Sequence, residues 1–165
     1  MENLENPQST PDHSFILKVI QPGLAGLMDG SVSTLAPLFA AAFATHSTHI
    51  AFVIGLSAAT GAGISMAFAE GLSDNGELTG RGHPVARGLI VGGMTFVGGI
   101  FHTIPFILHN LQLALYLAYF IVGIELITIA YIRYRFFKMN FFLSALQVIF
   151  GGVLVFVAGV LIGSA

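Results

Sequence analysis

The chain has 165 residues, of which 55% are hydrophobic and only 8% are charged. Ordinary soluble proteins carry roughly 25% charged residues, because charged side chains cover a surface that faces water. Six Lys and Arg and eight Asp and Glu cannot do this, and the mean hydropathy of +0.86 predicts an all-α integral membrane protein. The low basic content excludes nucleic-acid binding. The absence of cysteine excludes disulfides, Cys-ligated zinc and thiol catalysis.

The first fourteen residues are polar and acidic and include two prolines. A secretory signal would begin with basic residues and then become apolar, so we expect a disordered tail over 1–14 and a transmembrane domain over 15–165. A helix needs about 20 apolar residues to cross a bilayer. The sequence contains five such segments, namely 23–45, 49–72, 88–108, 111–132 and 140–162.

The basic residues predict how the chain is oriented, because Lys and Arg concentrate in cytoplasmic loops. Lys18 precedes the first span, two Arg lie between spans two and three, and three basic residues lie between spans four and five. All six fall on one side if the N-terminus is cytoplasmic, and five spans then place the C-terminus outside. We expect the cell (inner) membrane as the location, rather than a vacuolar membrane.

Small residues recur at every fourth position along the second span. One stripe consists of Ser57, Gly61 and Ser65, and the other consists of Ala59, Gly63 and Ala67. Small residues at this spacing let two helix backbones approach closely. Two interpretations stay open, which are ordinary packing within one chain and the seam of a homodimer.

Carboxylates inside a membrane are costly and tend to be functional. Asp29 lies within the first span, Glu70 lies near the inner end of the second, and Glu125 lies in the second half of the fourth. Met66 precedes Glu70 by four residues and therefore shares its helix face, at a depth similar to that of Asp29. A carboxylate with a thioether suits Fe(II) better than Mg²⁺ or Ca²⁺. Asp29, Met66 and Glu70 are therefore the predicted metal ligands.

Several of these residues also have plainer interpretations. A lone methionine is more often a packing residue, and Glu70 near the interface can simply reach water. Glu125 can pair with Arg133 or serve as a proton or secondary site. His46 and His49, on the outer side, can bind a metal that leaves the pore, although exposed loop histidines are commoner.

Four segments carry a likeness to a known group of membrane proteins. The first is GLMDGSVSTLAPLFAAA, with an acid–glycine pair before a run of small residues. The most specific is GLSAATGAGISMAFAEGLS, in which Gly-Ala-Ile-Ser-Met precedes a Glu by four residues. The third span ends in GIFHTIP, and the last span contains ALQVIFGGVLVFVAGVLIG. Over about residues 20–164, the chain thus resembles the vacuolar iron transporter family.

This resemblance implies a homodimer of five-helix subunits that moves Fe²⁺, and often Mn²⁺, out of the cytosol in exchange for protons. Its pore lies between the subunits. Asp29 and Met66 match the family's pore aspartate and methionine, and Glu70 matches a glutamate that follows the methionine in many bacterial-type members. Some members carry another glutamate eight residues before the methionine, where this chain has Ala58. The metal is a transported substrate, and no permanently bound cofactor is implied.

The loop between spans two and three departs from the family pattern. Many members hold a helical, glutamate-rich metal-collecting domain there, whereas this chain has about fifteen residues. Related membrane-bound ferritin-like proteins attach an iron-binding domain before the first span, and we expect none in this short tail. Metal capture would then depend on Asp74, Glu77 and His83, or on a separate iron-binding protein.

The sequence therefore predicts a minimal proton-coupled exporter of Fe²⁺ or Mn²⁺, in which Asp29 and Met66 of two subunits form the membrane site. No HExxH, GxSxG or GxxxxGK motif occurs, so we do not expect an enzyme. One alternative is a noncatalytic membrane anchor or docking partner for a soluble ferritin-like iron-storage protein. Another is a transporter of a different small solute.

Overall fold

The computed structural model describes residues 11–77 and 79–165, and within them every regular element is helical. The elements are α1 (Pro11–Phe15), η2 (Ile16–Ile20), α2 (Gln21–Ser33), α3 (Leu35–Thr45), α4 (Thr48–Gly71), α5 (Pro84–Phe101), η3 (Ile104–Ile107), α6 (Leu111–Phe137) and α7 (Phe141–Gly163). Most of the expected tail over 1–14 lies outside the described residues, and the chain is already helical at Pro11.

Five helical stretches are long and apolar enough to cross a membrane, which confirms the prediction of an all-helical chain with five candidate spans. They are His13–Thr45, α4, α5, α6 and α7. Large apolar side chains on α6 and α7 are exposed, and they include Tyr116, Phe120, Phe142, Leu146, Phe150 and Leu161. A continuous apolar surface of this kind fits contact with lipid.

Three spans differ from their expected bounds by more than one residue at an end, and the first begins at His13 instead of 23. Helix α6 continues to Phe137, beyond the expected end at 132. Helix α5 ends at Phe101, and the chain then turns through the short helix η3 instead of continuing to 108. Pro105 lies in this turn, and a proline removes one backbone N–H from the helical ladder, so it favours the early end of α5.

The first span is interrupted where the sequence places its prolines. A turn of π-helix over Ile16–Ile20 precedes Pro22, and the span breaks again at Thr34, between α2 and α3. Pro37 explains the second break, because its missing N–H leaves the carbonyl of Ser33 without its helical partner. The Thr34 hydroxyl donates to the Gly30 carbonyl oxygen at 2.8 Å and so supports the chain at the break.

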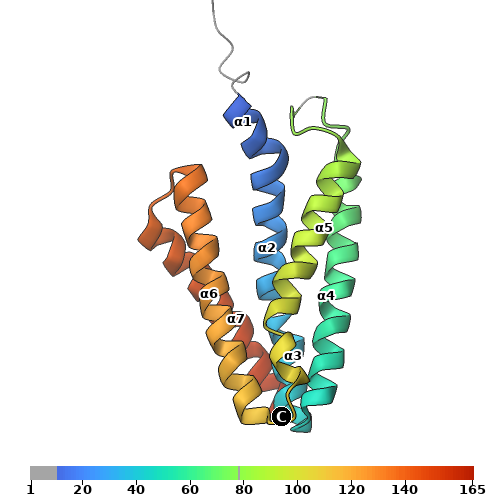
Figure 1. The fold of residues 1–165 in the computed structure, drawn as a ribbon, viewed down its shortest axis with the longest axis vertical. Helices are drawn as coiled ribbons and strands as arrows, with labels where there is room; N and C mark the ends of the chain where they lie inside the picture. The colour runs from blue at the N-terminus through green and yellow to red at the C-terminus, as the bar shows by residue number, and fades with distance from the viewer. Residues whose placement is uncertain (1–10, 78) are drawn as a thin grey trace, which may run out of the picture.

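Figure 1 shows α1 and the connections α4–α5 and α6–α7 at one end of the bundle, and the C-terminus at the other. We call the first of these the basic end, because all six Lys and Arg belong to segments near it. They are Lys18, Arg81, Arg87, Arg133, Arg135 and Lys138. A one-sided distribution is what the orientation rule requires, and a cytoplasmic basic end stays a prediction.

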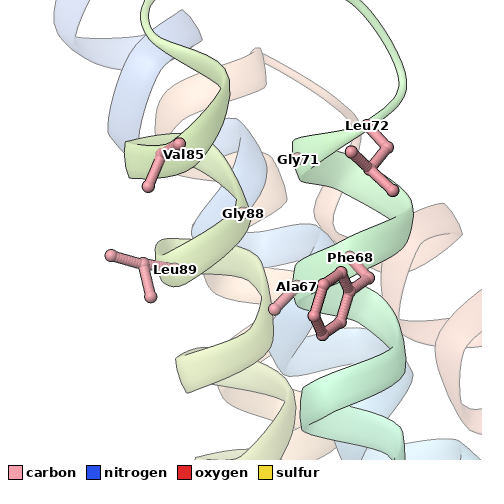
Figure 2. Close-up of a pocket in the computed structure, with 7 residues that line it drawn as sticks. All are labelled: Ala67, Phe68, Gly71, Leu72, Val85, Gly88 and Leu89. Atoms are coloured by element: carbon pink, nitrogen blue, oxygen red, sulfur yellow. The ribbon is translucent and has the colours of Figure 1, made fainter.

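The two small-residue stripes of α4 have different environments. Ala59 is fully buried, and a Cβ placed on Gly63 would lie 2.9 Å from the carbonyl oxygen of Gly92 in α5. The stripe with Gly63 is therefore the seam between α4 and α5, and Figure 2 shows its last part, where Ala67 and Gly71 lie opposite Gly88. The other stripe is exposed, with nothing within 4 Å of a Cβ on Gly61.

Candidate functional site

The acids at the basic end of α4 belong to an ion cluster around Arg87. The Arg87 side chain is fully buried, its Nε lies 2.6 Å from Glu70 Oε1, and its Nη1 donates to Asp74 Oδ1 at 3.0 Å. Its Nη2 donates to the Glu70 carbonyl oxygen and to Ser73 Oγ. Arg81 adds a second cation, because its Nη2 lies 2.8 Å from Glu70 Oε1.

This cluster changes the interpretation of Glu70. The planar guanidinium of Arg87 reaches two carboxylates and a carbonyl at once, which a point charge cannot do. The hydrogen bond from Arg87 lowers the pKa of Asp74, and the backbone N–H of Gly76 acts in the same direction. Both acids are thus charge-compensated, and a metal ion would have to displace two guanidinium groups from Glu70.

The other loop residues predicted to capture metal have structural roles or face water. Asp74 accepts from the Gly76 N–H at 2.6 Å and so shapes the loop. His83 precedes α5 and caps it, since its Nδ1 accepts from the Val85 N–H at 3.3 Å. Glu77 is exposed. In the part of the chain that the structure describes, no three His, Cys, Asp or Glu side chains form a group that could hold a metal.

Asp29 and Met66 lie on α2 and α4, and both side chains are half-buried. Helix α5 packs against both of these helices more extensively than they pack against each other. Among residues 11–77 and 79–165, Asp29 forms no ion pair, which distinguishes it from Glu70 and Glu125. Asp29 and Met66 of one chain thus offer two possible ligands, and a four-ligand site across two subunits stays a prediction.

The two histidines expected on the outer side, His46 and His49, are not arranged as a pair. His46 is exposed and ends α3 in the left-handed conformation, with φ of 51°. His49 is exposed as well, and it lines a cavity of about 290 Å³ together with His109, Thr48 and Phe106. The cavity therefore brings His49 together with His109, which precedes α6, rather than with His46.

A buried hydrogen-bonded pair lies within the spans and was not predicted from the sequence. His102 is fully buried at the end of α5, and its Nδ1 lies 3.0 Å from Oε2 of Glu125, which is 6% exposed. The His102 Nε2 lies 2.7 Å from the Thr34 hydroxyl. Of the two interpretations left open for Glu125, the pair with Arg133 is not the one observed, because Arg133 donates to Gln147 at 2.9 Å instead.

Glu125 also lines an apolar groove of about 530 Å³ between α2, α5 and α6. Leu27 of α2, Met94 and Phe101 of α5, and Ile121 of α6 line the same groove. The Oε1 atom of Glu125 is buried and has no hydrogen-bond partner among the described residues. A carboxyl group with one satisfied and one bare oxygen, in apolar surroundings, is the most unusual polar feature inside the spans.

Comparison of this chain with protein-family models, with curated proteins and with solved structures finds no match. The likeness to the vacuolar iron transporter family is therefore neither supported nor contradicted by known relatives. A function has to be argued from the placement and chemistry of the side chains themselves.

Proposed function

We propose that the protein is a minimal divalent-metal transporter that moves Fe²⁺, Mn²⁺ or both out of the cytosol in exchange for protons. The observation that carries this proposal is Asp29. Of the three acids in the predicted spans, Glu70 and Glu125 each have a basic partner, whereas Asp29 has no ion-pair partner in the described chain. An uncompensated carboxylate is expensive inside a membrane and attracts a cation.

The donor set favours a metal over an organic cation. Asp29 supplies a hard oxygen and Met66 supplies a soft sulfur, a combination that suits a borderline ion such as Fe²⁺. A single chain supplies too few ligands, so the proposal includes a homodimer in which two copies of Asp29 and Met66 face each other. The exposed Ser57–Gly61–Ser65 stripe supports this, because small residues permit close helix contact between subunits.

The remaining parts of the proposal follow from the basic end of the bundle. With this end in the cytoplasm, Glu70 and Asp74 lie where a metal would enter, and Glu70 would bind it only when Arg81 and Arg87 move away. The cell (inner) membrane is the proposed location. A separate iron-binding protein is a proposed partner, since no metal-binding group of three occurs in the described loop.

Flux into proteoliposomes tests the proposal, with the chain alone and with Fe²⁺, Mn²⁺, Co²⁺ and Zn²⁺ in competition. Asp29→Asn keeps the size of the side chain and removes its charge, so we expect at least a tenfold loss of flux without loss of folding or dimer. Glu77→Gln is the matched control, since it removes an exposed loop carboxylate. Near-normal flux through Asp29→Asn would remove this residue from the mechanism.

Met66→Leu tests the role of the thioether. Leucine nearly conserves the side-chain volume and removes the sulfur, so Fe²⁺ flux should fall more than Mn²⁺ flux. The measurement is the ranking of the four metals in the same liposomes. An unchanged ranking in Met66→Leu would make Met66 a packing residue. If the parent chain itself moved none of the four metals, the membrane-anchor function would be favoured.

A further inference from the structure

Three buried side chains link the first span to α6 through a continuous series of hydrogen bonds. The Thr34 hydroxyl donates to the Gly30 carbonyl oxygen at 2.8 Å. The Thr34 oxygen lies 2.7 Å from His102 Nε2, and His102 Nδ1 lies 3.0 Å from Glu125 Oε2. Thr34 and His102 are at most 1% exposed, and Glu125 is 6% exposed, so these bonds are shielded from bulk water.

With the Thr34 hydroxyl donating to Gly30, counting hydrogens gives the direction of the other bonds in this series. The Thr34 hydroxyl has one hydrogen and gives it to Gly30, so its oxygen accepts from His102 Nε2, which must carry a hydrogen. The contact between Nδ1 and Glu125 Oε2 then needs one further hydrogen. Without it, two lone pairs would face each other at 3.0 Å in a buried site.

The bare oxygen of Glu125 indicates where that hydrogen lies. An ionised carboxylate spreads its charge over both oxygens, and Oε1 has no partner among the described residues. With the hydrogen on Oε2, the pair consists of a neutral carboxylic acid and a neutral imidazole, and no unpaired charge is buried. In this state Glu125 donates to His102 Nδ1, His102 Nε2 donates to the Thr34 oxygen, and the Thr34 hydroxyl donates to the Gly30 carbonyl.

We propose that His102 and Glu125 together bind one exchangeable proton, and that its release reverses this series of hydrogen bonds. When one proton leaves to water, the hydrogen remaining on His102 moves to Nδ1 and is donated to the Glu125 carboxylate. The bare Nε2 then accepts from the Thr34 hydroxyl, which turns away from Gly30. The three side chains together carry three of these hydrogens before release and two after it. The Gly30 carbonyl then no longer accepts from the Thr34 hydroxyl.

This reversal connects the proton to the segment that carries Asp29. Gly30 follows Asp29 directly and lies at the end of α2, where the first span is broken. The use of this proton as the coupling ion for metal export rests on the proposed function. The binding of the proton by His102 and Glu125 does not, and it can be measured without transport.

The surrounding helices carry further ionisable groups, most of them on α6. Helices α3, α7 and η3 carry none, and Asp29 is the one on α2. On α5 there is also Arg87, which is held in the ion cluster, and α4 carries His49 and Glu70 towards its two ends. On α6, Arg133 lies about two turns from Glu125 and bonds Gln147, while the ring of Tyr119 stacks on Phe39. The remaining ionisable side chains of α6 are exposed, and they are Tyr116, Tyr131, Tyr134 and Arg135.

The first experiment follows the tautomer of His102 by ¹⁵N NMR in the reconstituted full chain. The other five histidines are exposed and can be replaced by Gln, which leaves His102 as the only signal. These are His13, His46, His49, His83 and His109. We expect an Nε2–H imidazole at low pH and a switch to Nδ1–H as the pH rises.

Glu125→Gln and Thr34→Val separate the proposal from simple burial of a histidine. The Gln amide donates to Nδ1 and cannot lose that hydrogen, so His102 should stay in the Nε2–H form over the whole pH range. Thr34→Val removes the hydroxyl and should shift the midpoint of the switch, whereas Thr34→Ser should restore it. A His102 tautomer that does not change with pH in the parent chain would overturn the proposal.

The second experiment measures how a proton gradient stimulates metal flux in proteoliposomes. Glu125→Gln should abolish the stimulation and retain downhill flux. If the tautomer switches and no metal is transported, the proton site stands and the proposed function fails. In the opposite case, metal is transported, the His102 tautomer does not change with pH, and the proton gradient still stimulates flux through Glu125→Gln. The proton site then fails and the proposed function stands.

Discussion

The hairpin of α4 and α5 and the hairpin of α6 and α7 are built in different ways. In the first, backbones meet directly, since a Cβ on Gly92 would lie 2.5 Å from the Gly63 carbonyl oxygen. In the second, Gly152 of α7 meets the side chain of Leu126, and a Cβ on Gly151 would have nothing within 4 Å. One hairpin is defined by backbone contact, and the other by the packing of bulky side chains.

The connections of the two hairpins differ in how many polar bonds hold them. The α4–α5 connection is held by the fully buried Arg87, which reaches two carboxylates and a hydroxyl. Near the α6–α7 connection, Asn140 caps α7 by accepting from the Leu143 N–H, and the hydrogen bond between side chains that the structure describes, from Arg133 to Gln147, is exposed. This difference indicates that the α4–α5 connection is held by more polar bonds than the α6–α7 connection.

Arg87→Ala should have the largest effect on this comparison. It removes a buried cation and leaves Glu70 and Asp74 without their main partner, so we expect a loss of about 3 kcal/mol in the free energy of unfolding. Arg133→Ala, the matched change in the other hairpin, should cost less than about 1 kcal/mol. Denaturant unfolding in detergent measures both, and equal losses would mean that the ion cluster does not stabilise the first hairpin.

Gly63→Leu should have the next largest effect. Its side chain would have to displace the carbonyl of Gly92, and overpacking of this kind costs about 2 kcal/mol. Gly151→Leu in α7 and Gly61→Leu on the exposed face of α4 meet open space and should leave the chain's own stability unchanged. If Gly61→Leu destabilised a monomeric chain as much as Gly63→Leu, the division of α4 into a packed and an exposed stripe would be wrong.

Gly61→Leu also tests the proposed dimer without disturbing the fold. If the exposed stripe is the seam between subunits, this variant should shift the protein from dimer to monomer while the unfolding curve of the monomer stays the same. Light scattering in detergent measures the mass. A dimer that tolerates Gly61→Leu would place the contact between subunits elsewhere.

The sequence was sufficient for the spans and insufficient for the pairing of their polar residues. Hydropathy located all five helices, because each needs only a long apolar run. It could not distinguish the two stripes of α4, because both have the same spacing and only the position of α5 decides which is buried. Arg87 was recognised as a basic residue that orients the chain, and its role as the centre of an ion cluster depends on how the loop folds back.

The pair of His102 and Glu125 was missed for a related reason. The two residues are 23 positions apart on different helices, and no spacing rule joins them. For Glu125 the sequence therefore left two interpretations open, which were a pair with Arg133 on the same helix and a proton or secondary site. The signal that could have found the pair was the presence of two ionisable residues in otherwise apolar spans, since each needs a buried partner.

Asp74→Asn should have the smallest effect, and the difference from the parent chain should be present at neutral pH and disappear at low pH. The hydrogen bond from Arg87 lowers the pKa of Asp74 below its ordinary value of 3.8, so the ionised acid stabilises the folded state above that value. This contribution is lost as the pH falls through the lowered pKa. Relative to Asp74→Asn, the parent chain should thus keep a constant advantage above about pH 5 and lose it progressively below about pH 4. Asn can still accept from the Gly76 N–H, so the comparison isolates the charge.

Two controls show whether this pH dependence belongs to the α4–α5 connection. Glu77→Gln removes an exposed acid from the same loop and should not change the slope of stability with pH in that range. Arg133→Ala should also leave the slope unchanged, because residues 138–140 of the α6–α7 connection contain no acid. If Asp74→Asn and the parent chain lost stability in parallel from pH 6 to pH 3, Asp74 would contribute no charge-dependent stability, and the buried Arg87 would act through Glu70 alone.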